Sequence, residues 1–295
     1  MTSTMINPAI QEQEMLSNNQ SEVYVRQFIL ALPGIAYIIY AFLNAYMTLI
    51  GAFLACGFVV VAHFPFTWGH WEKVRLFILC GFFYAFLYHL LPGFNHQLLY
   101  ADLGISVNSE TNLWLHVDLV LIVATFGLTF FVKDQRYKSI PVHHCAVQFI
   151  QILTPKYRSK IILNCWLMAL TVFVGLFFYF NLGTFELKVP TEIWIHWFVV
   201  SLFITTLSQE FFIRGELQYY FTSHFGLLGV IIASVVGGLF YLPISPVLAF
   251  IMCAIGLCTG YAYYKTQLIV SSILIHISIL ITHFCFLTYP FNFGG

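Results

Sequence analysis

The sequence predicts an all-α fold, a polytopic transmembrane bundle of about eight to nine transmembrane helices. Two features of its composition predict a membrane protein. Of the 295 residues, 60% are hydrophobic and only 8% are charged, whereas a soluble domain carries about 25% charged residues. A third observation is that apolar runs recur, and about 20 apolar residues in a helix cross a bilayer core.

The apolar runs divide the chain into nine predicted spans. Residues 28–66 contain no charged residue and are too long for one span, so we expect two helices with a tight turn near Asn44–Thr48. A helix break is expected at Pro243 and Pro246 because proline disrupts a helix interior. The other predicted spans are 76–98, 113–132, 161–182, 193–212, 226–246, 247–264 and 268–289.

Charge placement predicts the orientation. Half of all lysines and arginines lie between the fourth and fifth spans: Lys133, Arg136, Lys138, Lys156, Arg158 and Lys160. By the positive-inside rule, this basic loop, residues 133–160, is cytosolic. Counting the spans outward then places the N-terminus in the cytosol. Residues 1–26 are polar and acidic, unlike a signal peptide. We expect a multi-pass protein of the plasma (inner) membrane with a polar cytosolic tail over residues 1–26.

Composition also limits the partners. Twelve basic residues balance twelve acidic ones, so no basic field is available to bind nucleic acid. The expected partner is the lipid bilayer, and the oligomeric state is left open. The seven cysteines include no CxxC pair and are expected to be buried small hydrophobes rather than a disulfide set.

Charged residues inside a span are costly and therefore mark candidate sites. Asp118 and His116 fall near the outer end of one span, but two residues apart on a helix they point about 200° away from each other, so we expect no pairing. Glu210 and Arg214 have the i,i+4 spacing of an intrahelical ion pair. Gln209 and Glu216 are seven residues apart and would share a face of an α-helix. The simpler alternative is that Glu210 and Arg214 only neutralise each other at the cytosolic interface.

Three segments resemble a known family. Gln209-Glu-Phe-Phe-Ile-Arg-Gly215 is similar to the Glu-Glu-x-x-x-Arg-Gly signature of the CPBP (CAAX protease and bacteriocin-processing, or ABI) family, which includes the type II CAAX prenyl endopeptidases. Phe240-x-x-x-Ile244 occupies the place of its Phe-x-x-x-His motif. The glycine-rich stretch Gly256–Thr266, followed by His276, resembles its last motif. The resemblance implies a CPBP-like core over residues 190–289, preceded by transmembrane helices over residues 27–189.

This chain differs from the family's motifs at the residues to which the resemblance assigns catalysis. The resemblance assigns the family's first glutamate, which activates water, to Gln209, and its second to Glu210. The histidine of the second motif falls at Ile244, and the asparagine four residues after His276 falls at Leu280. A glutamine amide cannot act as a general base, and losing one oxyanion donor typically costs about 10²–10³ in rate.

Three functions are therefore weighed. The resemblance favours an intramembrane endopeptidase with an altered catalytic site, acting on a membrane-associated peptide or protein through Glu210, Arg214, His276, Gln209 and Glu216. The alternative is an inactive pseudoprotease that serves as a membrane binding, immunity or secretion factor. A transporter with a relay through Asp118, Glu210 and Arg214 fits less well, because no internal repeat is present.

No cofactor and no metal ion are predicted. One alternative stays open, in which a cluster of Glu210 or Glu216 with His276 and His283 binds zinc. His276 and His283 are seven residues apart and share a helix face, but His283 should lie about 10 Å farther along the span. The sequence has no HExxH motif.

Overall fold

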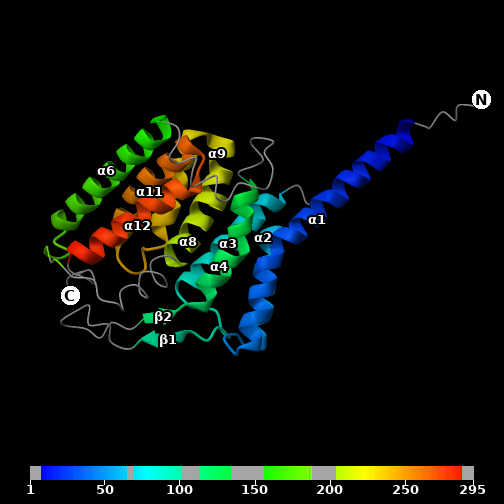
Figure 1. Cartoon of the computed structure of the whole chain (residues 1–295), viewed down its shortest axis with the longest axis horizontal. Coiled ribbons are helices and arrows are strands. Elements are labelled where there is room, and N and C mark those ends of the chain that lie inside the picture. The colour runs from blue at the N-terminus through cyan, green and yellow to red at the C-terminus, as the bar shows by residue number, and fades with distance from the viewer. Residues whose placement is uncertain are drawn as a thin grey trace, which may run out of the picture.

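Long helices running side by side form the body of the protein (Figure 1). The computed structural model describes residues 8–64, 70–100, 113–133, 156–185, 187 and 204–287. Its helices are α1 (Pro8–Leu43), α2 (Leu49–His63), α3 (Trp71–Leu87), α4 (Val117–Lys133), α6 (Lys156–Tyr179), α8 (Ile204–Glu210), η3 (Phe211–Gln218), α9 (Tyr219–Phe225), α10 (Leu227–Leu239), α11 (Pro246–Thr266) and α12 (Ile269–Phe286). The 1–26 tail before Pro8, the basic loop from 134 to 155 and the first part of the 193–212 span lie outside the described residues.

The helices have the length and surface of membrane spans. In the described part of the chain, four helical stretches are long and apolar enough to cross a bilayer: Tyr24–Leu43, Arg158–Tyr179, Pro246–Thr266 and Ile269–Phe286. Large apolar side chains also face outward, and Phe53 and Phe77 are 79% and 80% exposed. Because such surfaces are unfavourable in water, the chain is an integral membrane protein. The count of eight to nine spans stays a prediction.

Local sequence signals place two helix boundaries as expected. The chain turns between Leu43 and Leu49, and the Thr48 side chain accepts a hydrogen bond from the Gly51 amide at the start of α2. Pro246 stands at the start of α11, where the missing N–H costs no hydrogen bond. The predicted turn at Asn44–Thr48 and the predicted break at the proline pair are both confirmed.

The connection after α3 differs from the prediction. The 76–98 run was expected to stay helical, but α3 ends at Leu87 and His89 has a φ of +54°. A short strand, β1 (Gln97–Tyr100), then pairs antiparallel with β2 (Leu113–Leu115). Within the described residues the bundle therefore carries one short two-stranded ladder, and the all-α prediction is confirmed.

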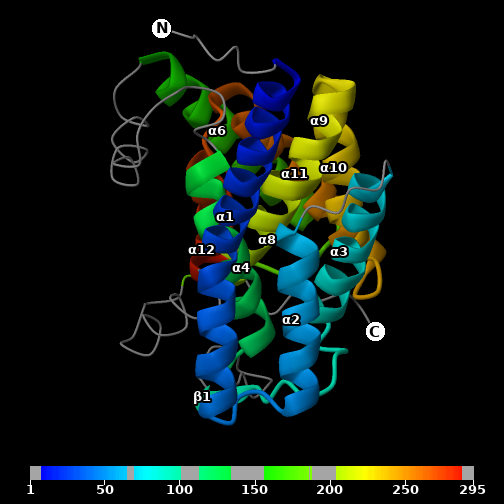
Figure 2. The same ribbon diagram turned by 90° about the vertical axis from the view of Figure 1, so that its right-hand side faces the viewer.

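Two apolar clusters form the core of the described chain. The larger one joins α1–α4 to η3, α10 and α12 and includes Phe58, Phe86 and Phe126 in edge-to-face contacts. The second joins α6, α11 and α12. Figure 2 shows α1 running beside α2 and α4, with which it packs. The segment η3 belongs to the larger cluster. It contacts α4, α8 and α10, and all of its residues are buried.

Candidate active site

A π-helical segment carries the motif of Glu210 and Arg214. Residues Phe211–Gln218 have the wider turn of a π-helix, and all eight are buried. Hydrogen bonds in a π-helix join residues i and i+5, and such segments are common at functional sites. The wider turn changes which residues share a face, so the α-helical spacing used for the sequence prediction does not apply beyond Glu210.

The Glu210 carboxylate is the centre of a buried polar network. His276 Nδ1 lies 2.7 Å from Oε1, and the hydroxyl of Ser272 donates to Oε2. Arg214 Nε donates to the same Oε2 at 3.2 Å. Each of the four residues is at most 4% exposed. The predicted i,i+4 ion pair is confirmed, but it lies inside the protein and not at an exposed interface.

The other donor groups of Arg214 form hydrogen bonds to side chains that hold the guanidinium in place. Nη1 donates to Gln218 Oε1 at 3.1 Å, and Nη2 donates to Thr259 Oγ1 at 2.9 Å. Gln218 in turn donates to the backbone oxygen of Gly260. Since a buried guanidinium is stable only when it is paired and hydrogen-bonded, this network fixes the position of Glu210 as well.

Two glycines of α11 make room for the guanidinium. A Cβ at Gly256 would lie 3.3 Å from Arg214 Nη2, and one at Gly260 would lie 2.7 Å from Gln218 Oε1 and 3.0 Å from Arg214 Nη1. In the sequence this stretch stands out through its resemblance to the family's last motif. In the structure the spacing of four places both glycines against the same buried side chain.

A small cavity lies beside this network, with space for about one water molecule. Its polar lining consists of Gln209, Glu210, Arg214, Ser234, Tyr241, Thr259 and His276. A water there would lie beside a carboxylate–imidazole pair and beside amide and hydroxyl donors. Those groups are the ones needed to activate water and to stabilise negative charge on a carbonyl oxygen.

Four of the five predicted site residues come together, and Glu216 does not. Gln209, Glu210, Arg214 and His276 line the cavity. Glu216 instead pairs with Arg75 of α3, whose Nη2 lies 2.8 Å from its Oε2. The prediction that Glu216 shares a face with Gln209 was wrong because it assumed α-helical geometry across a π-helical segment.

The zinc alternative at this site is not supported. His283 is buried against α6, with its ring 5.9 Å from the ring of Phe173 and 6.0 Å from that of Phe177, and it does not line the cavity. Glu216 is held by Arg75. Within the described residues, Glu210 and His276 have no third metal-ligating side chain close enough to complete a site.

The apolar residues at the positions of the family's second histidine and asparagine lie away from the cavity. A tyrosine lines the cavity instead. Ile244 is half exposed in the turn before α11, and Leu280 packs against the larger core cluster. Tyr241, which the sequence analysis did not single out, lines the cavity. Ser272 could have been given a role beforehand, because it precedes His276 by one helical turn, whereas the place of Tyr241 depends on how the turn folds.

Comparison with known proteins gives a match over the part of the chain that forms the cavity. Residues 191–281 match the family model of the type II CAAX prenyl endopeptidase Rce1-like proteins. No curated protein and no solved structure matches the chain. The match contains α8, η3 and the part of α12 that carries His276, so the cavity is built from the matched segment. The match therefore supports a likeness of residues 191–281 to the CAAX protease-like family.

Proposed function

We propose that the protein is an intramembrane endopeptidase that hydrolyses a peptide bond of a membrane-associated peptide or protein. The observation that carries this proposal is the pairing of Glu210 with His276 beside a water-sized polar cavity. The family match supports it. Gln209 cannot take a proton, so the activity requires a base other than the family's first glutamate.

His276 is the proposed general base. With Glu210 ionised, the Nδ1–H of His276 donates to the carboxylate, which leaves Nε2 as the nitrogen that can accept a proton. Nε2 takes a proton from the water as its oxygen attacks the scissile carbonyl carbon. The protonated imidazole then returns that proton to the leaving amine as the C–N bond breaks, and Glu210 stabilises the positive charge in between.

The other polar groups have supporting roles in this proposal. The Tyr241 hydroxyl, the Gln209 amide and the Ser234 hydroxyl, which is buried without a hydrogen-bond partner, line the cavity and are donors near a developing oxyanion. Arg214 is a positioning residue, because its donors are engaged by Glu210, Gln218 and Thr259. No covalent intermediate and no cofactor enter this scheme.

A second candidate function is an inactive relative that binds membrane-protein partners. It is favoured by one observation: both carboxylate oxygens of Glu210 are engaged by neighbouring side chains. In that case the network would serve stability and not chemistry. A relay through Asp118 has less support, since among the described residues its carboxylate contacts His89, His96 and the Leu119 amide.

The test compares newly formed protein termini in membranes that contain equal amounts of wild type, His276→Gln or Glu210→Gln. We expect the amount of wild-type-specific termini to fall at least about 100-fold in both variants, because general base catalysis contributes at least about 100-fold to the rate. His283→Gln is the matched control, a buried histidine on the same helix outside the cavity, and it should retain them. If the wild type produces no terminus that depends on His276, the endopeptidase proposal fails and the inactive relative is favoured.

A further inference from the structure

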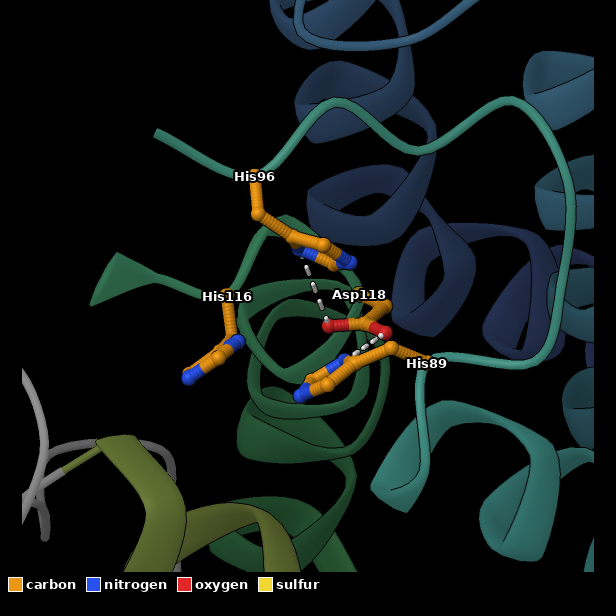
Figure 3. A group of neighbouring side chains, drawn as sticks. All are labelled: His89, His96, His116 and Asp118. Carbon is orange, nitrogen blue, oxygen red and sulfur yellow. Dashed lines mark hydrogen bonds and ion pairs between the residues drawn. The ribbon is translucent and has the colours of Figure 1, made fainter. Parts of the chain in front are cut away.

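A second cluster of functional side chains lies far from the cavity residues in the sequence, where α3, the strands and α4 meet. It contains His89, His96, His116 and Asp118, whose nearest ligand atoms all lie within 4.8 Å of one another. Figure 3 shows the rings of His89 and His96 on either side of the Asp118 carboxylate, with His116 beside them. His116 and Asp118 were expected to point apart, but their ligand atoms lie within 4.8 Å of each other without a hydrogen bond, because His116 precedes the first residue of α4 and does not follow helical geometry.

We propose that these four side chains bind one divalent transition-metal ion of the zinc class. Three imidazoles and one carboxylate form an N₃O ligand set of the kind that zinc takes in tetrahedral geometry. Calcium and magnesium prefer oxygen ligands alone. Because all four positions are supplied by the protein, the site is a structural one, which ties the α3–β1 connection to the start of α4.

The present arrangement leaves nitrogen atoms for which an ion would provide a partner. Nδ1 of His96 and Nδ1 of His116 are buried without a hydrogen-bond partner, and His96 Nδ1 is 3.9 Å from Asp118 Oδ1, too far for a hydrogen bond. His89 Nδ1 is 2.7 Å from Oδ2 of the same carboxylate. With tetrahedral metal–ligand distances of about 2.0–2.2 Å, ligand atoms lie about 3.4 Å apart, so pairs as wide as 4.8 Å need to close by up to about 1.4 Å. A metal would take the place of the proton between His89 and Asp118.

The three histidine rings pack against one another. The His89 and His116 rings are stacked with centroids 4.2 Å apart, and the His89 and His96 centroids are 4.4 Å apart. This packing brings the ring nitrogens together beside the Asp118 carboxylate, where one ion can reach all four side chains.

Backbone contacts hold the ligand-bearing segments in place. The Asn95 amide donates to the Tyr46 carbonyl at 2.8 Å, and the Thr48 amide donates to the Gly93 carbonyl at 2.8 Å. These bonds fix the loop that carries His96 to the turn between α1 and α2. The Tyr37 hydroxyl donates to the Val117 carbonyl at the start of α4. The Leu119 amide bonds Asp118 Oδ1 and orients the carboxylate, as hydrogen bonds around metal ligands commonly do.

The test uses the full chain, purified in detergent through a tag without histidine, stripped with a chelator and titrated with ZnCl₂. We expect about one zinc ion per chain, since four ligands make one tetrahedral site. His116→Ala and Asp118→Asn should each weaken binding at least about 100-fold, since even loss of an outer-shell partner costs 10–100-fold. His224→Ala, an exposed histidine on α9, should bind as the wild type does.

A spectroscopic variant separates ligation from a role in folding. In His96→Cys a thiolate replaces one imidazole, so Co²⁺ binding should be retained and should add a sulfur-to-metal charge-transfer band that the wild type lacks. Absence of stoichiometric zinc in the wild type would overturn the proposal. Wild-type affinity in His116→Ala, or Co²⁺ bound to His96→Cys without the new band, would overturn it as well.

Discussion

At the scale of single residues, the main feature is a carboxylate buried with every oxygen engaged. Glu210 is 2% exposed and is held by Arg214, Ser272 and His276. Removing one partner of a buried ion pair is costly, about 3–5 kcal/mol, because the remaining charge is left without compensation. The network therefore makes the arrangement of the cavity depend on each of its members.

The glycines beside Arg214 allow a test at this scale. Gly260→Ala places a methyl group 2.7 Å from Gln218 Oε1, and overpacking of this kind costs about 1–3 kcal/mol of unfolding free energy. Thermal unfolding in detergent should show the loss, and His276-dependent cleavage should fall with it. Gly175→Ala is the control, since a Cβ there meets nothing within 4 Å. Equal stability of the two variants would contradict the proposed packing role.

At the scale of elements, the π-helical segment determines which acidic residue enters the cavity. Glu210 stands at its start and Glu216 near its end. Under α-helical geometry Glu216 would share a face with Gln209, but the wider turn directs it to Arg75 of α3. The same segment thus supplies one carboxylate to the candidate active site and another to the packing of a neighbouring helix.

This division predicts a separation of stability from activity. Arg75→Ala removes the arginine that pairs with the buried Glu216 carboxylate, which costs about 1–3 kcal/mol of unfolding free energy. Cleavage per folded molecule should stay within a few-fold of wild type, because neither residue lines the cavity. Thermal unfolding and the terminus assay measure the two effects. Lys73→Ala, an exposed cation on the same helix, should change neither, and a large loss of cleavage in Arg75→Ala would argue for a direct role of Glu216.

At the scale of the whole molecule, the two sites depend on different parts of the bundle. The candidate active site uses α8, η3, α11 and α12, and the histidine cluster uses the ends of α3 and α4. With the predicted orientation, the start of α3 faces the cytosol. Its end, with the histidine cluster, faces the other side. A metal there would stabilise the fold without entering the proposed reaction.

Labelling from one side of the membrane tests this orientation. In a chain whose cysteines are replaced by serine, Lys73→Cys and Leu90→Cys place exposed thiols at opposite ends of α3. A membrane-impermeant maleimide added to intact cells should label Leu90→Cys and not Lys73→Cys, because the basic loop is expected in the cytosol. Both should react after permeabilisation. Labelling of Lys73→Cys alone in intact cells would show that the protein has the opposite orientation.

The sequence by itself determined the class of protein, several helix ends and the candidate motif. Few charges and long apolar runs specify membrane helices in any arrangement, and Pro246 suits the first turn of a helix because it has no backbone N–H to leave unpaired. The Glu210–Arg214 pair also depends on local spacing. These properties are set by neighbours along the chain, so they can be predicted without knowing the fold.

Only the tertiary structure decided which distant side chains meet. Arg75 and Glu216 are 141 residues apart in the sequence. Their contact depends on a π-helical turn that the residue pattern does not predict. His89 and His96 fall where a span was expected, and they reach Asp118 because α3 ends early. Such contacts follow from packing between segments, since helix register and loop path are set by the surrounding core and not by local sequence.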